Sequence, residues 1–185
     1  MAYDRIKNDF LWLKDAGVVL PVYNVTEPKS PLIISEKRNL FKLFLSDVGL
    51  LTSQYPNITK LKILQKDSSI NNGALFENVA AQELFAKGNK VYYYNNKKTG
   101  EIDFILELDG QVLPLVIKSG KDYKRHSALS NVLSNAYYGI EEAFVFGNMN
   151  LEVEGKKVYY PIYMLMFLEE TKVDRMSYRL DLSDL

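Results

Sequence analysis

A tight turn at Asp109-Gly110 constrains the fold of this chain more than any other feature of its sequence. This dipeptide readily adopts the two positive φ angles of a type I′ turn, and an apolar-rich run lies on each side of it. The turn therefore predicts a β-hairpin over residues 101–120 and fixes its register. The predicted cross-strand pairs are Leu108 with Gln111, Leu106 with Leu113, Phe104 with Leu115, Asp103 with Val116, and Glu101 with Lys118.

The hairpin is predicted to have one apolar and one polar face, because successive side chains of a strand point to opposite sides of the sheet. The apolar face is expected to hold Ile102, Phe104, Leu106, Leu113, Leu115 and Ile117. The other face carries two carboxylates, Glu101 and Asp103, beside Val116 and Lys118. Such a group at the open end of a hairpin offers oxygen ligands for a divalent cation next to a positive charge.

The scarcity of cysteine and histidine limits the kinds of catalytic and metal sites that this chain can form. The 185 residues include no cysteine, which excludes disulfides, thiolate zinc sites and a cysteine nucleophile. The single histidine, His126, excludes multi-histidine metal sites, and we expect it to be a surface or helix-capping residue and not a catalytic base. Any catalysis must then rest on carboxylates, lysines, tyrosines or hydroxyl groups.

The net charge is zero, since 23 basic residues balance 23 acidic ones, so the chain lacks the overall basic character of many nucleic-acid-binding proteins. No apolar run approaches the roughly 20 residues of a membrane helix, and no signal peptide opens the chain. We therefore expect a cytoplasmic protein without membrane partners. The phosphate-binding pattern G-x-x-x-x-G-K-[ST] is absent, so the chain is not expected to hydrolyse ATP by itself.

Residues 1–54 predict a helix followed by a two-stranded ribbon. The expected elements are a helix over 6–14, strands over 18–25 and 39–46, and a helical turn over 48–53. This order is that of the latter part of a winged-helix module without its recognition helix. The polar residues 55–72 are predicted to be a linker with about one helical turn.

Residues 73–170 predict an α/β domain. The expected order is a helix over 73–88, a strand over 91–94, the hairpin, a helix over 127–138, a strand over 142–146 and a strand pair over 151–160. Such an order describes a mixed sheet with helices on its faces. The apolar segment Ile162–Leu168 is predicted to be a buried helix or strand, and residues 171–185 a C-terminal tail.

Several motifs of this chain resemble those of known families. A glutamate on the first helix of the domain, an acid on a strand and a lysine ending the next strand resemble the restriction-endonuclease-like PD-(D/E)xK fold. The sequences GALFEN at 73–78, EIDFIL at 101–106 and LPLVIKSGK at 113–121 are similar to an uncharacterised C-terminal domain of bacterial and archaeal AAA-type ATPases. WLKDAGVV at 12–19 and FKLFLSDVGLL at 41–51 resemble the segment that joins that domain to the ATPase's winged helix.

The resemblance implies a restriction-endonuclease-like mixed sheet flanked by helices, preceded by a partial winged-helix ribbon. It places the catalytic positions on Glu77, Asp103 and Lys118, with Asp103 as a Mg²⁺ ligand. A second oxygen for the metal would have to come from Glu101 or Glu77. Where the family usually reads I-E-V-K, this chain has Val116 in place of the second metal-binding carboxylate. We therefore expect Mg²⁺ binding to be weak or absent.

Two functions of different classes remain open. The first is a nuclease-like domain associated with DNA, with a degenerate Mg²⁺-dependent phosphodiesterase site and with Lys121, Lys124 and Arg125 as phosphate contacts. The second is a non-catalytic module that binds or regulates an ATPase domain or another protein chain. On residue types alone, Glu101 and Lys118 also fit an ordinary cross-strand ion pair.

Overall fold

The computed structural model describes residues 2–67, 69–120 and 122–170. Its helices are α1 (Ala2–Asp15), α2 (Val48–Ser53), α3 (Asn57–Leu64), α4 (Gly73–Ala86) and α5 (Ser127–Ser134), with the 3-10 helices η1 (Leu32–Ser35), η2 (Ala136–Tyr138) and η3 (Ile162–Phe167). Its strands are β1 (Val19–Val25), β2 (Glu36–Leu45), β3 (Tyr92–Asn96), β4 (Gly100–Leu108), β5 (Gln111–Lys118), β6 (Ala143–Gly147), β7 (Glu152–Glu154) and β8 (Lys157–Pro161). The predicted α/β class is confirmed. The predicted tail, residues 171–185, lies outside the described residues.

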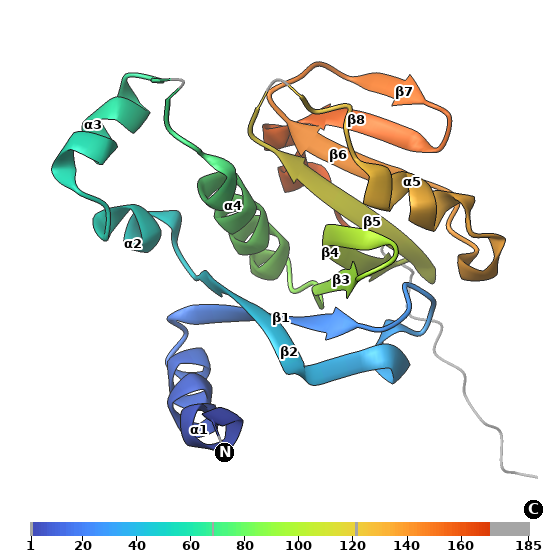
Figure 1. Cartoon of the computed structure of the whole chain (residues 1–185), viewed down its shortest axis with the longest axis horizontal. Coiled ribbons are helices and arrows are strands. Elements are labelled where there is room, and N and C mark those ends of the chain that lie inside the picture. The colour runs from blue at the N-terminus through green and yellow to red at the C-terminus, as the bar shows by residue number, and fades with distance from the viewer. Residues whose placement is uncertain (1, 68, 121, 171–185) are drawn as a thin grey trace, which may run out of the picture.

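These strands form one mixed sheet in the order β2-β1-β3-β4-β5-β6-β8-β7 (Figure 1). The pairs β1–β3, β5–β6 and β6–β8 are parallel, and the other neighbouring pairs are antiparallel. The N-terminal ribbon β1–β2 therefore belongs to the same sheet as the strands that follow residue 90. The hairpin β4–β5 lies at the centre of this sheet.

The turn of the hairpin has the predicted geometry. Asp109 and Gly110 have φ angles of 51° and 76°, as a type I′ turn requires. The ladder pairs Leu108 with Gln111, and the predicted register holds as far as Phe104 with Leu115.

The predicted apolar face is wrong for one of its six residues, Ile102. On strand β3, Tyr92 pairs with Ile105 and Tyr94 pairs with Ile102, so β4 has one residue more than β3 between these two pairs. Such a β-bulge interrupts the alternation of side chains. As a result, Ile102 packs in the core on the opposite side of the sheet from Phe104.

The predicted pairs beyond Phe104 are also wrong. The β4–β5 ladder ends there, so Asp103 is not paired with Val116, nor Glu101 with Lys118. Instead, a carboxylate oxygen of Asp103 accepts a hydrogen bond from the backbone N–H of Ile117 at 2.7 Å. The side chain thus supplies an acceptor to strand β5 where the regular ladder stops.

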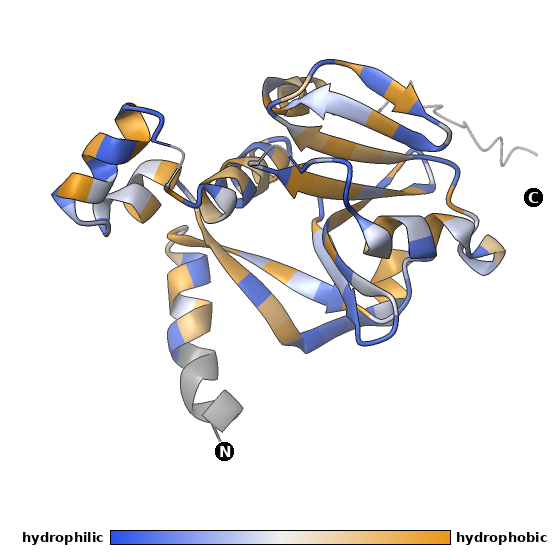
Figure 2. Cartoon of the chain, turned by 45° about the horizontal axis from the view of Figure 1, so that its top comes forward, coloured by the Kyte–Doolittle hydropathy of each residue, from blue (hydrophilic) through white to orange (hydrophobic). Residues whose placement is uncertain are grey.

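Each face of the sheet is covered by one principal helix (Figure 1). Helix α4 packs on a core whose buried residues include Ala80, Ala81, Leu84, Phe104, Leu106, Leu115 and Ile117. Helix α5 packs on a second core whose buried residues include Ala128, Leu129, Val132, Ile105, Val116 and Val145. The central strands are accordingly coloured as largely hydrophobic in Figure 2.

Helix α4 also holds the end of the N-terminal ribbon. The Asn78 side chain accepts a hydrogen bond from the Leu45 N–H at 2.9 Å and donates one to the Leu45 carbonyl at 3.0 Å. One turn later, Gln82 accepts a hydrogen bond from the Val48 N–H at 3.0 Å. Two amide side chains of α4 thereby fix the junction between β2 and α2.

Two other segments differ from their predictions. The segment 55–72, expected to contain about one helical turn, contains the eight-residue helix α3. The segment expected to be buried after β8 forms η3, of which only Leu165 is buried, while Tyr163 and Phe167 are exposed. No helix in the described part of the chain is long and apolar enough to span a bilayer.

Candidate functional site

A hollow of about 610 Å³ opens where strands β4 and β5 meet helix α5. We call it the α5 hollow. Its lining residues are Gly100, Glu101, Asp103, Val116, Lys118, Lys124, Arg125, His126, Ser127, Ala128, Leu129 and Ser130. The predicted acid of β4, the predicted lysine of β5 and the intervening valine therefore surround one space.

Asp103 is held by the strand beside it. Its hydrogen bond to the Ile117 N–H fixes the carboxyl group at the bulge. Burial raises the pKa of Asp103, an effect that this hydrogen bond and the charges of Lys42 and Lys118 oppose. The balance favours a carboxyl group that takes up a proton more readily than an exposed aspartate.

Glu77 lies on α4. Burial raises its pKa, and the nearby charge of Asp103 raises it further, while Lys42 and Lys118 act in the opposite direction. Glu77 does not line the α5 hollow. It belongs electrostatically to the same charged cluster.

Glu101 is engaged elsewhere, in a way that the sequence did not reveal. Its carboxylate forms an ion pair with Lys42 of β2 and accepts a hydrogen bond from the Asn95 amide at 2.6 Å. Lys42 lies over the Tyr93 ring, 5.2 Å from its centroid. The alternative of an ion pair between Glu101 and Lys118 is wrong, because Lys42 is the partner. The sequence placed Lys42 in the predicted strand 39–46 but did not indicate its contact with Glu101.

Lys118 is the last residue of β5 and pairs in register with Gly147 of β6. A Cβ atom at Gly147 would collide with the carbonyl of Lys118, so this glycine allows the two strand ends to approach closely. Val116, two residues before Lys118, is only 5 % exposed and packs among apolar residues of the α5 core.

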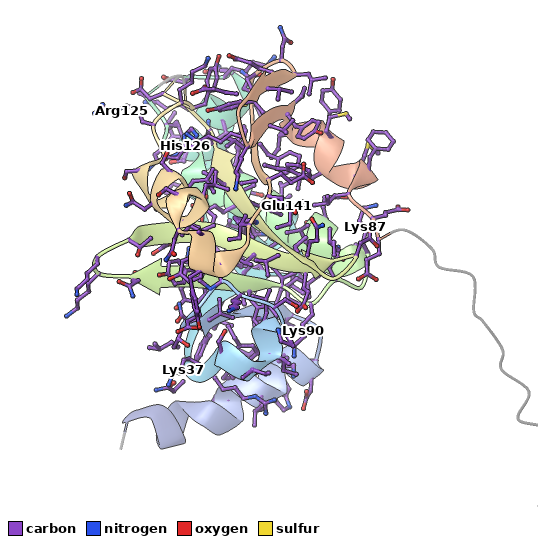
Figure 3. The ribbon with its side chains drawn as sticks, turned by 90° about the vertical axis from the view of Figure 1, so that its right-hand side faces the viewer. Lys37, Lys87, Lys90, Arg125, His126 and Glu141 are labelled. Atoms are coloured by element: carbon purple, nitrogen blue, oxygen red, sulfur yellow. The ribbon has the colours of Figure 1, made fainter. Side chains whose placement is uncertain are left out.

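Of the three residues predicted to contact phosphates, two line the α5 hollow. Lys124 and Arg125 line the hollow, whereas Lys121 lies outside the described residues. Lys124 also forms an ion pair with Glu152 at 2.5 Å. Arg125 is exposed at the start of α5, beside His126 in the sequence (Figure 3).

Of the two positions predicted for His126, a surface site is wrong, whereas a place at the end of a helix is confirmed. It occupies the N-cap position of α5 but makes no capping hydrogen bond with its side chain, and only 9 % of the residue is exposed. Its Nε2 lies 3.0 Å from the hydroxyl of Tyr159, a residue that is itself buried. The sequence contained no signal for this contact, which joins segments 33 residues apart.

The residues present do not fit a Mg²⁺ site. Within residues 2–67, 69–120 and 122–170, no three carboxylates or histidines converge as metal ligands. Glu101 is paired with Lys42, one oxygen of Asp103 is bonded to the backbone, and Val116 has no donor atom. Two oxygen-bearing side chains in these states are a poor match for a cation that needs near-octahedral oxygen coordination.

Comparison with known families matches residues 72–165 to DUF4143, a domain of unknown function. The match runs from the start of α4 to η3, and so includes the central hairpin, α5 and the whole α5 hollow. No curated protein and no solved structure matches the chain significantly.

Proposed function

The chain belongs to the DUF4143 family, and on that premise we propose that it is a nuclease-like domain that binds nucleic acid without cleaving it. The arrangement of a helix glutamate, a strand aspartate and a strand-ending lysine supports a relation to the PD-(D/E)xK fold. The similar motifs support a place for the domain among AAA-type ATPases. The argument for function rests on the chemistry of the α5 hollow, since a fold alone does not define an activity.

One observation carries the proposal: Asp103 and Lys118, at the positions that the resemblance gives to a nuclease site, line one hollow with Val116, which stands where that site would have its second acid. Nucleases of this type use carboxylates to bind the metal that activates water and stabilises the charge on the phosphate. A valine supplies no ligand. Lys118, Lys124 and Arg125 nevertheless offer positive charge to a phosphate backbone.

The test is to restore the missing carboxylate. Wild-type protein is expected to bind labelled DNA in fluorescence anisotropy with a steep salt dependence, and to leave it intact with or without Mg²⁺. Val116→Glu is expected to gain Mg²⁺-dependent cleavage, because Val116 lines the hollow and a longer side chain there can reach its solvent. Lys118→Ala in the Val116→Glu background should abolish the cleavage.

Val116→Gln is the matched control, since glutamine has nearly the same size as glutamate but lacks the negative charge that binds a metal ion. Cleavage by Val116→Glu but not by Val116→Gln would support a degenerate nuclease site. If wild type does not bind DNA at low salt, the proposal is wrong. If Val116→Glu folds, binds no Mg²⁺ and leaves DNA intact, the relation to a nuclease site is wrong.

A second candidate function is a non-catalytic module that binds an ATPase domain. Helices α2 and α3 bury no residue and project from the sheet (Figure 1), and they expose Leu50, Ile58, Leu61 and Leu64. Exposed apolar side chains gathered on one projection are typical of protein interfaces. If this is the function, Leu61→Asp with Leu64→Asp should abolish co-purification with an AAA-type ATPase and leave DNA binding unchanged.

A further inference from the structure

His126 has a buried nitrogen with no partner. Its Nε2 is hydrogen-bonded to Tyr159, but Nδ1 is buried and has no hydrogen-bond partner among the described residues. An unsatisfied buried polar atom costs about 1–3 kcal/mol, so a hydrogen-bond partner for Nδ1 would stabilise the protein. His126 also lines the α5 hollow.

The neighbours of His126 determine what kind of group it needs. The Tyr159 hydroxyl has one proton, and the Glu154 carboxylate, 3.4 Å away, can only accept it. We assign that proton to Glu154, which leaves the Tyr159 oxygen to accept the proton on Nε2 of His126. Burial lowers the pKa of His126, as do the charges of Lys157 and Lys118, while Glu154 opposes them, so the neutral form of the ring is favoured. In a neutral ring with its proton on Nε2, Nδ1 is an acceptor. The missing partner is therefore a hydrogen-bond donor.

The rest of the hollow favours an anion. Ser130 donates the first backbone hydrogen bond of α5, to the His126 carbonyl at 3.2 Å. The N–H groups of Ser127, Ala128 and Leu129 precede it, all three residues line the hollow, and these groups have no backbone acceptor in the described part of the chain.

Two cations strengthen this preference. Neither Lys118 nor Arg125 has a carboxylate within 4.0 Å among the described residues. The hollow therefore presents helix amides and two cations without a close ion-pair partner, next to a nitrogen that needs a proton donor. Two carboxylates also line it, Glu101, which is paired with Lys42, and Asp103, whose pKa is raised by burial.

An anion that can also donate a hydrogen bond meets both requirements. A phosphomonoester has a second ionisation near pH 6, so one of its oxygens holds or shares a proton close to neutrality, whereas a phosphodiester inside a strand has no such proton. We propose that the α5 hollow binds the terminal phosphomonoester of a nucleic-acid strand, with one proton shared between a phosphate oxygen and Nδ1 of His126. This inference rests on the proposed function, since it defines which part of a nucleic acid the same hollow binds.

The size of the hollow is suitable. Ligand pockets usually measure about 300–1,000 Å³, and the α5 hollow, at about 610 Å³, has room for a terminal nucleotide and its phosphate. A free nucleotide presents the same phosphate chemistry, so the experiment must separate the two sources.

The first experiment observes His126 directly, because it is the only histidine in the chain. Nitrogen-15 NMR of the imidazole ring at pH 7 is expected to show a neutral ring with the proton on Nε2. Thymidine 5′-monophosphate, or a 5′-phosphorylated oligonucleotide, should shift the Nδ1 resonance toward the protonated position and raise the pKa of His126. The same oligonucleotide with a 5′-hydroxyl should not.

The second experiment measures affinity by anisotropy. Wild type should bind the 5′-phosphorylated oligonucleotide at least about tenfold more tightly than the hydroxyl form, and His126→Phe should remove that difference. Arg125→Gln should weaken binding of both forms. Lys37→Gln removes an exposed charge on β2, far from Arg125 and His126 in Figure 3, and should change the binding of neither form.

The outcomes separate the two proposals. If both oligonucleotides bind equally and Nδ1 does not respond, the phosphomonoester inference is wrong while DNA binding stands. If only the mononucleotide shifts Nδ1 and no DNA binds, the phosphate site stands and the proposed function is wrong. If none of the ligands shifts the Nδ1 resonance, the inference is wrong, and this result does not depend on whether His126→Phe folds.

Discussion

Asn78→Ala should destabilise the protein strongly, because Asn78 makes two hydrogen bonds to one backbone unit from a buried position. Its side chain is only 2 % exposed and bonds to both the N–H and the carbonyl of Leu45. Truncation leaves two backbone groups without partners, at about 1–3 kcal/mol each when water is excluded. Leu45 is only partly buried, so water can satisfy some of that loss. We therefore expect a total of about 3 kcal/mol in the free energy of unfolding.

The assay is equilibrium unfolding in urea followed by circular dichroism, together with thermal melting. For a chain of this size, about 3 kcal/mol corresponds to a decrease of roughly 6–12 °C in Tm. Gln82→Ala, which removes the single hydrogen bond from Val48, should cost about 1 kcal/mol. Glu83→Ala on the same helix serves as a baseline, since Glu83 makes no hydrogen bond or ion pair among the described residues.

A further variant separates hydrogen bonding from packing. Asn78→Leu keeps the number and branching of the side-chain heavy atoms but makes no hydrogen bond, so it should be about as destabilising as Asn78→Ala. A loss below about 0.5 kcal/mol for Asn78→Ala would refute the reasoning, because it would equal an ordinary surface substitution. Recovery of stability in the leucine variant would show that a cavity, and not the lost hydrogen bonds, caused the effect.

Other substitutions test the site and its frame. Gly100→Ala should lower the free energy of unfolding by about 2–3 kcal/mol, because Gly100 has φ +102° and a Cβ there would lie 2.8 Å from the Cβ of Ala128 in α5. Gly155→Ala is the control: Gly155 has φ +59°, a Cβ there would meet no atom within 4 Å, and the loss should be only about 1 kcal/mol. Burial raises the pKa of Glu77, so the folded state binds this proton more tightly than the unfolded state, and the glutamate lowers stability as pH rises through its folded pKa. Glu77→Gln should therefore stabilise the protein more at pH 7 than at pH 4, relative to wild type, in paired urea titrations, and an equal effect at both pH values would contradict the assigned shift. Calorimetry of wild type with Mg²⁺ should show weak binding only, and tight stoichiometric binding would contradict the argument from Val116.

The hairpin was predictable because its register depends on two adjacent residues. Asp109 and Gly110 both accept positive φ, and the pairs from Leu108–Gln111 to Phe104–Leu115 follow by counting. Local chemistry of this kind needs no knowledge of the rest of the fold. The α/β class likewise follows from the order of periodic segments.

The misplaced residues depend on long-range contacts. Ile102 changes face because of a bulge against β3, and no residue type in the hairpin indicates it. Lys42 reaches Glu101 from β2, and His126 at the start of α5 contacts Tyr159 of β8, so both contacts exist only once the fold is assembled. Such partners cannot be read from spacing in one sequence.

The parallel pairing of β1 with β3 has a consequence for the order of folding. The paired residues, Tyr23–Val25 and Tyr92–Tyr94, are separated by about 65 residues of chain, whereas the central hairpin closes across two. Short connections close earliest and distant ones late, so we expect the ribbon β1–β2 to join a core that has already formed around β4 and β5. The hydrogen bonds of Asn78 to that ribbon would then be absent from the folding transition state, and their loss would speed unfolding while leaving the folding rate nearly unchanged.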